Sequence, residues 1–311
     1  NGGNNGSATV TGSGGTAAID YTYSWNTTPV QTTATASNLV AGNYTVTVTD
    51  DNGCIATDNV GITEPTVLAA TMGTPTAVSC NGAVPADGSV TVVASGGTVA
   101  GNYTYLWSDG QTTATASNLS AGNYSVTITD DNSCSVAAGP VTITEPSAVV
   151  ASMGIPSMVS CNGGNDGSVT VTASGGTVVG NYAYLWSDGQ TTATANNLAI
   201  GNYSVTVTDD NGCFGSAGPI TITEVTAITQ SNIKTHVLCN GDANGNIELT
   251  VNGGTAPYNI SWSGAATGNP PGDEVNSSGG NYTMSGLIAG DYDITITDNN
   301  GCVLSLTDQT I

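Results

Sequence analysis

An internal repeat constrains this chain more than any other feature. Its four tryptophans are almost evenly spaced, with differences of 82, 79 and 76 in sequence number between Trp25, Trp107, Trp186 and Trp262. Segments 105–134 and 184–213 are identical at 25 of 30 positions. Self-similarity at a fixed period is typical of tandem repeats, in which each copy is one structural unit. The sequence therefore predicts a row of duplicated modules.

We predict four repeats, at residues 1–65, 66–146, 147–225 and 226–311. A strand with the sequence I-T-E ends each of the first three, and in two of these cases a proline follows, which stops strand pairing. Repeat 1 begins with N-G-G-N-N-G-S, which aligns with N-G-G-N-D-G-S after Cys161, so we expect it to be truncated at its start. Repeat 4 has diverged, and we expect its extra stretch, 264–280, to be a surface loop.

The hydrophobic pattern within a repeat has a period of two, as in Tyr182-x-Tyr184-x-Trp186. The alternate positions are polar in other copies, so these aromatic side chains face inward. Asp188-Gly189 follows the tryptophan at hairpin-turn spacing. Gly201-Asn202-Tyr203 enters a strand in the way of the tyrosine corner of immunoglobulin-type sandwiches. These signals predict an all-β protein, a tandem array of four small Ig-like β-sandwich repeats.

The charge balance excludes two classes of partner. The chain has one Lys, no Arg, one His and 23 acidic residues, for a formal net charge of -22. Binding to nucleic acid or to an anionic membrane surface requires clustered basic side chains, so we expect neither. No stretch approaches 18 consecutive apolar residues, so we also expect no direct insertion into a membrane.

Seven cysteines occur at two positions of the repeat. One position is a C-N-G segment and holds Cys80, Cys161 and Cys239. The other follows D-N-G or D-N-S and holds Cys54, Cys134, Cys213 and Cys302. By alignment, the eighth cysteine would stand just before Asn1. A sandwich of this size buries a modest core, so we expect covalent bridges, and bridges place the protein outside the cytoplasm.

Two pairings compete, and reduced cysteines are a third alternative. We favour pairing within repeats, which gives Cys80–Cys134, Cys161–Cys213 and Cys239–Cys302, with Cys54 paired to a residue before Asn1. The other pairing crosses the boundaries and gives Cys54–Cys80, Cys134–Cys161 and Cys213–Cys239. It would join the outer ends of consecutive strands, beyond the ~7 Å Cα limit for a disulfide. An odd number of strands between the two cysteines of a repeat would argue against pairing within repeats, because it would separate them by the length of the sandwich.

The sequence offers little material for catalysis. Repeats 1 to 3 contain no His and no Lys, so they cannot supply a general base near neutral pH or a Ser-His or Cys-His pair. His236 lies near Lys234 in the least typical repeat and reads as a surface residue. We therefore predict that the protein is not an enzyme and assign no catalytic and no cofactor-binding residue.

Calcium is the one candidate metal ion. Acidic residues recur in the turns before the second set of cysteines, at Asp50, Asp51, Asp130, Asp131, Asp209, Asp210 and Asp298. Carboxylate oxygens in a turn suit a hard cation. Asp87, Asp166, Asp242, Glu64, Glu145 and Glu224 would complete such sites between repeats. The alternative is that D-N-G simply makes a tight turn between strands. No segment fits the twelve-residue EF-hand loop.

The combination C-N-G, G-G-T, W-S-D-G and G-N-Y-x-V-T-V-T-D-x-N-G-C, with the final I-T-I-T-E, resembles the SprB-type repeats of Bacteroidota surface proteins, which include gliding-motility adhesins. The resemblance covers all four repeats and is clearest in repeats 2 and 3. It implies a very long extracellular protein, exported by the type IX secretion system, whose repeats form a filament on the cell surface. It carries over no active site.

These observations predict a structural repeat segment of an extracellular bacterial adhesin, a stalk or fibre attached to the cell surface. Its expected partners are neighbouring repeats of a longer chain, other filaments by lateral self-association, and an external surface or polysaccharide. The alternative is an array of carbohydrate- or ligand-binding modules. That reading needs exposed aromatic side chains, and only Tyr21, Tyr103 and Tyr182 are candidates.

Overall fold

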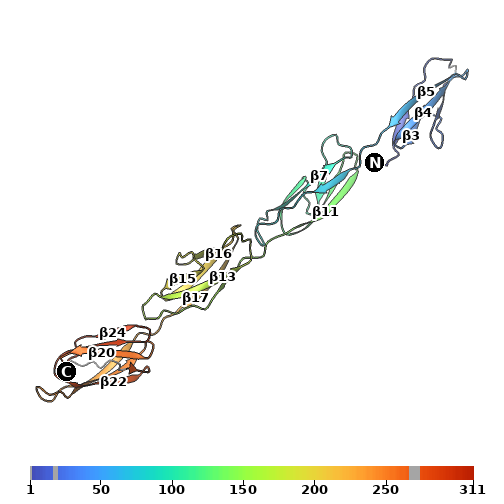
Figure 1. The fold of residues 1–311 in the computed structure, drawn as a ribbon. Coiled ribbons are helices and arrows are strands. Elements are labelled where there is room, and N and C mark those ends of the chain that lie inside the picture. Colours follow the sequence, from blue (N-terminus) through green and yellow to red (C-terminus); the bar gives the residue numbers. More distant parts are fainter. Residues whose placement is uncertain (1, 17–19, 266–273) are drawn as a thin grey trace. The chain divides into compact units, whose positions relative to one another are not determined.

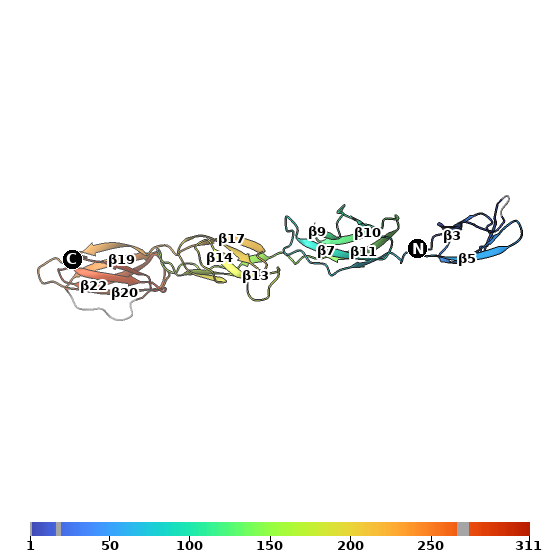
Figure 2. The ribbon, with the colours of Figure 1, turned by 90° about the horizontal axis from the view of Figure 1, so that it is seen from above.

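The computed structural model describes residues 2–16, 20–265 and 274–311. All regular elements in these ranges are β-strands (Figure 1, Figure 2). No helix long and apolar enough to cross a membrane occurs in the described residues. The chain divides into two compact units, Asn1–Glu145 and Pro146–Ile311. The predicted all-β, Ig-like tandem architecture is confirmed.

Repeat 3 shows the architecture of one module. One antiparallel sheet has the order β12-β13-β15, with β12 at Val150–Met153, β13 at Gly167–Ser174 and β15 at Thr194–Leu198. The other has the order β14-β16-β17, with β14 at Ala183–Trp186, β16 at Gly201–Thr208 and β17 at Phe214–Ile222. Val171, Trp186, Val205 and Val207, among others, form the core between the two sheets.

Repeat 2 has the same two sheets. The first contains β6 (Ala69–Met72), β7 (Gly88–Ser95) and β9 (Thr115–Leu119), and the second contains β8 (Thr104–Trp107), β10 (Gly122–Thr129) and β11 (Ser135–Ile143). In repeat 1 the sheets are β1 (Gly6–Thr9) with β3 (Thr35–Leu39), and β2 (Thr22–Trp25) with β4 (Gly42–Thr49) and β5 (Ile55–Ile62).

Repeat 4 departs from this plan where its sequence diverges. Its sheets are β18 (Thr229–Thr235), β19 (Gly245–Asn252) and β22 (Gly280–Leu287), and β21 (Glu274–Val275), β20 (Tyr258–Gly264), β23 (Tyr292–Thr297) and β24 (Val303–Leu306). The expectation of a plain loop over 264–280 is wrong at its ends, because β21 pairs with β20 and Gly280 begins β22. Residues 266–273 of that stretch lie outside the described residues.

Tryptophan lies at the centre of three of the four cores. Trp25, Trp107 and Trp186 are each 2% exposed, and their indole Nε1 groups donate to Thr33, Thr113 and Thr192 carbonyls. A buried indole needs such an acceptor for its N–H. In repeat 4, Tyr258 and Tyr292 are fully buried, while Trp262 is half-buried. Among the described residues, the buried indole N–H of Trp262 has no acceptor.

The tyrosine corner predicted from G-N-Y is present. The hydroxyls of Tyr44, Tyr124 and Tyr203 donate to the carbonyls of Val40, Ser120 and Ala199 at 3.0 to 3.1 Å. Each bond fastens the start of a strand to the connection that precedes it. This contact is a hallmark of Ig-type sandwiches.

The direction of the strands decides which loops share an end of the module. In repeat 3 the segment at Ser157 pairs antiparallel with β13, and Val159 pairs parallel with Glu224, just after β17. β17 therefore runs opposite to β13. Since β16 is antiparallel to both β14 and β17, and β15 is antiparallel to β13, β14 and β15 run in the same direction. They act as one strand that changes sheets, so only three passes separate the start of β13 from the start of β17.

Each module consequently has two chemically distinct ends. We call the end with the G-G-T segment and the D-x-N-x-C turn the entry pole, because the chain enters the module there. We call the end with the C-N-G loop and the I-T-E carboxylate the exit pole. In repeat 3 these are residues 175–177 with 209–213, and residues 161–163 with Glu224, respectively. Because β17 has nine residues, the two poles are about 30 Å apart.

Candidate functional site: the junction between repeats

At the entry pole, the first aspartate of each D-x-N-x-C turn is a structural acceptor. Asp209 is 7% exposed. Its Oδ1 accepts from the backbone N–H groups of Asn211 and Cys213, at 3.0 and 2.8 Å, and its Oδ2 accepts from the N–H of Thr177 at 2.7 Å. Asp50, Asp130 and Asp298 make the same three bonds in their own repeats. This carboxylate therefore ties the D-x-N-x-C turn to the G-G-T segment.

The glycine before that threonine is required by the same contact. Gly176 has a φ of +69°, a left-handed conformation that favours glycine, and a Cβ there would lie 2.4 Å from Oδ2 of Asp209. The second glycine of the G-G-T segment thus leaves room for the aspartate carboxylate. Thr177 precedes Asp209 by 32 residues, so no local spacing in the sequence indicates this partnership.

The second aspartate of the D-D pairs in repeats 2 and 3 holds a neighbouring loop. Oδ2 of Asp210 accepts from the N–H groups of Val179 and Gly180, at 2.5 and 3.1 Å, and Asp131 does the same for Ala100 and Gly101. These backbone donors, that of Val179 first, hold the pKa of Asp210 below its ordinary value. The N–H of Thr177 is the main cause of the lowered pKa of Asp209, as the N–H of Thr98 is for Asp130 and that of Thr16 for Asp50.

The sign of these shifts predicts acid sensitivity. A carboxylate whose pKa is depressed in the folded state stabilises the fold above its unfolded pKa, and this stabilisation is lost as the pH falls through the folded value. We expect the melting temperature to be level between pH 5 and 8 and to fall below about pH 4. In the Asp209→Asn variant, the melting temperature of repeat 3 should fall less steeply at low pH. Asp188→Asn, at a carboxylate bonded to the nearby Gln190, is the matched control. Melting is followed by circular dichroism. If the melting temperatures of both variants fell equally at low pH, the Asp209 carboxylate would not be the cause of the acid sensitivity.

In the structure, the aspartates considered as calcium ligands accept hydrogen bonds from backbone N–H groups. Within the described ranges, no group of three or more His, Cys, Asp or Glu side chains is placed to hold a metal ion. Asp50, Asp130, Asp209 and Asp298 each use both carboxylate oxygens on backbone donors of their own repeat. Glu64, Glu145 and Glu224 accept hydrogen bonds from the glycines of their own repeats' C-N-G loops, and Glu64 lines the same cleft as Asp130 of repeat 2. Of the two alternatives, these occupied carboxylate oxygens favour the plain turn, and calcium binding is the alternative that remains to be tested.

A melting experiment tests the calcium prediction directly. Because the turn carboxylates already accept three backbone hydrogen bonds each, we expect the same melting temperature in EDTA and in millimolar calcium chloride. A melting temperature that falls in EDTA and recovers with calcium, but not with magnesium, would establish a calcium site instead.

At the exit pole, two carboxylates shape the C-N-G loop. In repeat 3, Oε2 of Glu224 accepts from the N–H of Gly163 at 2.6 Å, and its Oε1 accepts from Nδ2 of Asn162 at 2.9 Å. Asp166 accepts from the N–H of Ser160 at 2.9 Å and from its hydroxyl at 2.5 Å. The Ser160 hydroxyl and N–H hold the pKa of Asp166 below its ordinary value. The cysteine between these anchored residues is thus held in a fixed place.

The same carboxylate recurs in the other exit poles. Glu145 accepts from the N–H of Gly82 at 2.9 Å, and Glu64 accepts from the N–H of Gly2 at 2.6 Å. Asp87 accepts from the N–H of Ser79, as Asp166 does from Ser160. In repeat 4 the position of Asp166 is taken by Asn244, which accepts from the N–H of Leu238 at 3.4 Å. Asp242 accepts from the amide of Asn244, also at 3.4 Å.

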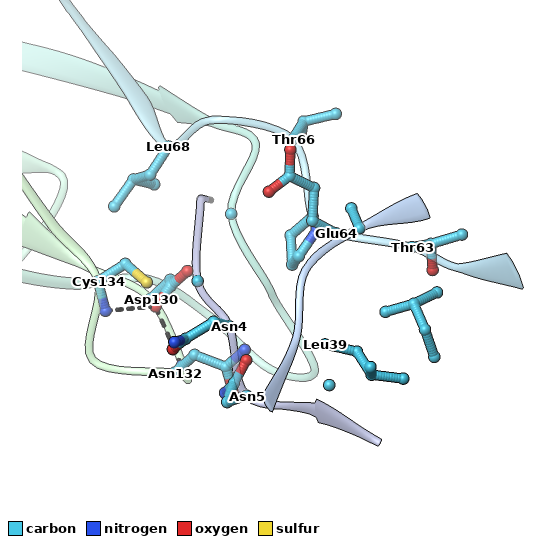
Figure 3. A pocket seen from close by; sticks show the side chains of 16 residues that line it. Asn4, Asn5, Leu39, Thr63, Glu64, Thr66, Leu68, Asp130, Asn132 and Cys134 are labelled. Carbon is cyan, nitrogen blue, oxygen red and sulfur yellow. Dashed lines mark hydrogen bonds between the residues drawn. The ribbon is translucent and has the colours of Figure 1, made fainter. Parts of the chain in front are cut away.

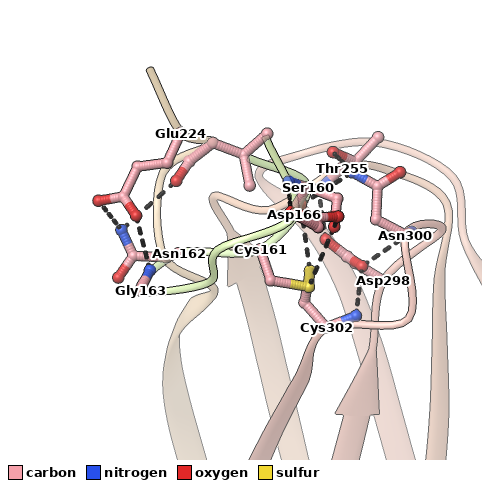
Figure 4. Close-up of a disulfide and its surroundings, with 11 residues drawn as sticks. Ser160, Cys161, Asn162, Gly163, Asp166, Glu224, Thr255, Asp298, Asn300 and Cys302 are labelled. Atoms are coloured by element: carbon pink, nitrogen blue, oxygen red, sulfur yellow. Dashed lines mark hydrogen bonds between the residues drawn. A yellow bond between two sulfur atoms is a disulfide. The ribbon is translucent and has the colours of Figure 1, made fainter. Parts of the chain in front are cut away.

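The disulfide at this site joins consecutive repeats. Cys161, in the C-N-G loop of repeat 3, is bonded to Cys302, in the D-x-N-x-C turn of repeat 4, across a sequence separation of 141 residues (Figure 4). Their Cα atoms are 5.5 Å apart. Beside the bond, Nδ2 of Asn300 donates to the carbonyl of Ser160 at 3.0 Å. The exit pole of repeat 3 and the entry pole of repeat 4 therefore meet in a covalent junction.

The predicted pairing within repeats is wrong. Cys161 is bonded to Cys302 rather than to Cys213, and the alternative that crossed each boundary between adjacent cysteines is wrong for Cys161 as well. Cys80 and Cys213 also take part in disulfide bonds. Cys54, Cys134 and Cys239 are free and exposed, so neither Cys80–Cys134 nor Cys239–Cys302 forms.

The physical reason is the direction of the strands. Cys161 lies beside the end of β17, and Cys213 lies directly before its start, so nine residues of extended chain separate them. A disulfide spans a Cα separation of less than ~7 Å. Four strands, β13 to β16, lie between the two cysteines, but β14 and β15 form a single pass, so the number of passes is odd. The two cysteines of one repeat therefore point to different neighbours.

The peptide linker at this junction is very short. Glu224 is bonded to the C-N-G loop of repeat 3, and the carbonyl of Thr226 accepts from the N–H of Gly254 in repeat 4 at 2.8 Å. Only Val225 lies between these two anchored residues. The equivalent bonds join Gly97 to Thr66 and Gly176 to Ser147. Repeats 3 and 4 are thus connected by a one-residue linker and, in parallel, by a disulfide.

The tyrosines considered for ligand binding have a structural contact instead. The hydroxyls of Tyr21, Tyr103 and Tyr182 donate to the carbonyls of Gly14, Gly96 and Gly175, the first residue of each G-G-T segment. All three side chains are half-buried. They support the entry pole from within their own repeats.

Comparison with known proteins finds one repeat family. The SprB repeat model matches residues 72–112, 156–191 and 231–267, so the chain contains SprB repeats. The matches fall in the predicted repeats 2, 3 and 4. No curated protein matches the chain.

Two similar solved structures are also tandem arrays. The tetra-tandem repeat in the extending region of a large adhesion protein is 17% identical, with 94% of this chain and 92% of that chain covered and a TM-score of 0.29. The N-terminal eight Ig domains of Down Syndrome Cell Adhesion Molecule are 12% identical, with a TM-score of 0.28. That comparison covers 100% of this chain and 58% of the other.

Proposed function

We propose that this run of SprB repeats is a structural segment of an extracellular bacterial adhesin, a stalk that carries mechanical load between the cell and a surface. The chain would act through its length and stiffness and not through chemistry on a substrate. The family match and the tandem Ig-like architecture support this proposal.

The observation that carries it is the doubly connected junction of repeats 3 and 4. A flexible array of binding modules would use linkers that let each module turn, as Gly/Ser-rich segments do. Here Val225 is the only residue between two hydrogen-bonded anchors, and the Cys161–Cys302 bond closes the other side. Two separate connections resist bending more than one does. Such a joint suits a rigid spacer.

The bonded cysteines also support a location outside the cytoplasm, since disulfides persist in oxidising compartments. Export by the type IX system, a role in gliding motility and filament formation at the cell surface are parts of the same proposal. The low content of basic residues fits an exposed stalk, because a trypsin-like protease could cut only after Lys234.

Small-angle X-ray scattering of the oxidised chain tests the stalk. Four modules of ~35–40 Å in a row predict a rod with a largest dimension of about 140–160 Å. We expect this length to stay constant with salt concentration, because a chain with one Lys and no Arg cannot hold the row by ion pairs. A compact globule of this chain length would measure only about 60 Å across, and that result would refute the stalk.

Glycan-array binding separates the stalk from the alternative module array. We expect no binding that depends on Tyr103 or Tyr182, because both hydroxyls are bonded to the G-G-T segment. Binding that is lost in Tyr103→Ala and Tyr182→Ala variants, while circular dichroism shows that they remain folded, would favour the carbohydrate-binding alternative.

A further inference from the structure

The three free cysteines follow a rule that the Cys161–Cys302 bond defines. In that bond, the C-N-G loop of one repeat joins the D-x-N-x-C turn of the next repeat. Applied along the chain, the rule leaves three cysteines without a partner in this sequence, and these are the free cysteines Cys54, Cys134 and Cys239. Pairing within repeats would have left only Cys54 unpaired. The oxidation states therefore fit junction pairing.

Cys134 is unlike the other two, because the repeat that should supply its partner is present. Repeat 1 begins at Asn1, which aligns with Asn162, so the position immediately before Asn1 corresponds to Cys161. The structure supports this alignment. Gly2 donates to Glu64 at 2.6 Å as Gly163 donates to Glu224 at 2.6 Å.

The receiving surface around Cys134 is already formed. Asp130 accepts from the N–H groups of Asn132 and Cys134 as Asp298 does in its own turn (Figure 3). A cleft of about 490 Å³ lies here between the Gly3–Gly6 segment of repeat 1 and the turn with Asn132 and Cys134. The corresponding cleft beside Cys302, where the disulfide is formed, measures about 210 Å³. The junction at Cys134 therefore has room beside its turn for a C-N-G loop residue.

From this geometry we propose that the D-x-N-x-C turn of repeat 2 is the receiving half of an inter-repeat disulfide. A cysteine placed immediately before Asn1, at the position that corresponds to Cys161, would bond to Cys134. Under the same rule, Cys54 could pair only with a C-N-G loop cysteine and Cys239 only with a D-x-N-x-C turn cysteine. The inference rests on the proposed stalk function in that it extends the stapled joint to the other repeats, but its thiol test does not depend on the chain being a stalk.

The bond forms by thiol–disulfide exchange with a small-molecule disulfide such as oxidised glutathione. The thiolate of the first cysteine attacks glutathione disulfide, which forms a mixed disulfide and releases one glutathione thiolate. The Cys134 thiolate then attacks the cysteine sulfur of the mixed disulfide and releases the second glutathione thiolate. Two protein thiols are oxidised, one glutathione disulfide is reduced, and the two protons pass to the released glutathione thiolates.

The test adds one cysteine directly before Asn1 of the full chain. The variant then has the three free thiols of the native chain and one more. After equilibration with oxidised and reduced glutathione, we expect the thiol titre to fall from four to two. Non-reducing digestion with mass spectrometry should yield a peptide in which the added cysteine is linked to Cys134. Scattering and circular dichroism of native and variant chains report separately on the stalk and on folding.

Two outcomes would overturn the proposal. A titre that stays at four, in a variant with native circular dichroism, would show that the two thiols do not meet. A peptide linking the added cysteine to Cys54 would establish pairing within the repeat instead. The matched control carries the same added cysteine with Cys134→Ser, and it should keep all three of its remaining free thiols. Loss of thiols in this control would mean that the added cysteine pairs without Cys134.

Discussion

Pulling the oxidised chain by its two ends is expected to release almost none of the length folded into repeats 3 and 4. The shortest covalent route through this unit runs fifteen residues from Pro146 to Cys161, crosses to Cys302 and continues nine residues to Ile311. At ~3.5 Å per residue this route is about 90 Å long. The full backbone from Pro146 to Ile311 would extend to roughly 580 Å. The disulfide therefore withholds about 500 Å of chain from extension.

Single-molecule force spectroscopy measures this difference. The handles should be joined to the ends by peptide ligation, so that no cysteine is used. Traces recorded with a phosphine reductant should contain at least about 500 Å of added contour length that oxidised traces lack. Repeat 1 is an internal standard, because its one cysteine, Cys54, is free. It should release roughly 200 Å under both conditions.

Variants test whether the Cys161–Cys302 bond causes this difference in contour length. In the oxidised Cys161→Ser/Cys302→Ser chain, we expect repeat 4 to add an unfolding step of roughly 250 Å that the oxidised wild-type chain lacks. Cys239→Ser, at an exposed free cysteine of the same repeat, should leave the oxidised traces unchanged. Equal contour lengths in oxidised and reduced wild-type chains would show that the bridge does not bear load.

Replacing Trp186 by alanine is expected to give the largest loss of stability of any single side-chain truncation in repeat 3. Trp186 is 2% exposed, lies between the two sheets and donates its indole N–H to the Thr192 carbonyl. Truncation of a buried tryptophan costs about 3–5 kcal/mol, and here it also removes the indole hydrogen bond to the Thr192 carbonyl. A module with a small core has little stability in reserve.

The neighbouring residue provides the control for this substitution. Leu185 is 60% exposed on the same strand, so Leu185→Ala should change the free energy of unfolding by less than about 0.5 kcal/mol. Hydrogen exchange of β16 amides, measured by mass spectrometry in increasing urea, reports on repeat 3 alone. Comparable protection of β16 in the two variants would mean that the tryptophan is not the centre of the core.

Much of the fold could be predicted because its signals are local. The alternation at Tyr182, Tyr184 and Trp186 identifies a strand and its inner face over a short stretch of sequence. The G-N-Y motif before Val205 places a tyrosine corner, which requires only the carbonyl four residues earlier. A repeated sequence adds copies of the same signal, and thereby separates residues that the fold needs from those that vary.

The junction could not be predicted because its contacts are long-range. Asp209 resembles a metal ligand in sequence, and only the fold shows that the N–H of Thr177, 32 residues earlier, occupies its second oxygen. The pairing of Cys161 depends on whether β14 and β15 count as one strand or two. Hydrophobic alternation has the same period in either case. The lack of an acceptor for the Trp262 indole among the described residues likewise depends on packing that the W-S motif does not encode.

The long separation of Cys161 and Cys302 also sets the order of events during biosynthesis. The thiol of Cys161 must wait for 141 further residues before its partner exists. At typical rates of synthesis this delay is roughly 7 to 30 s. The Cys161–Cys302 bond therefore cannot form before the following repeat has been made up to its last turn.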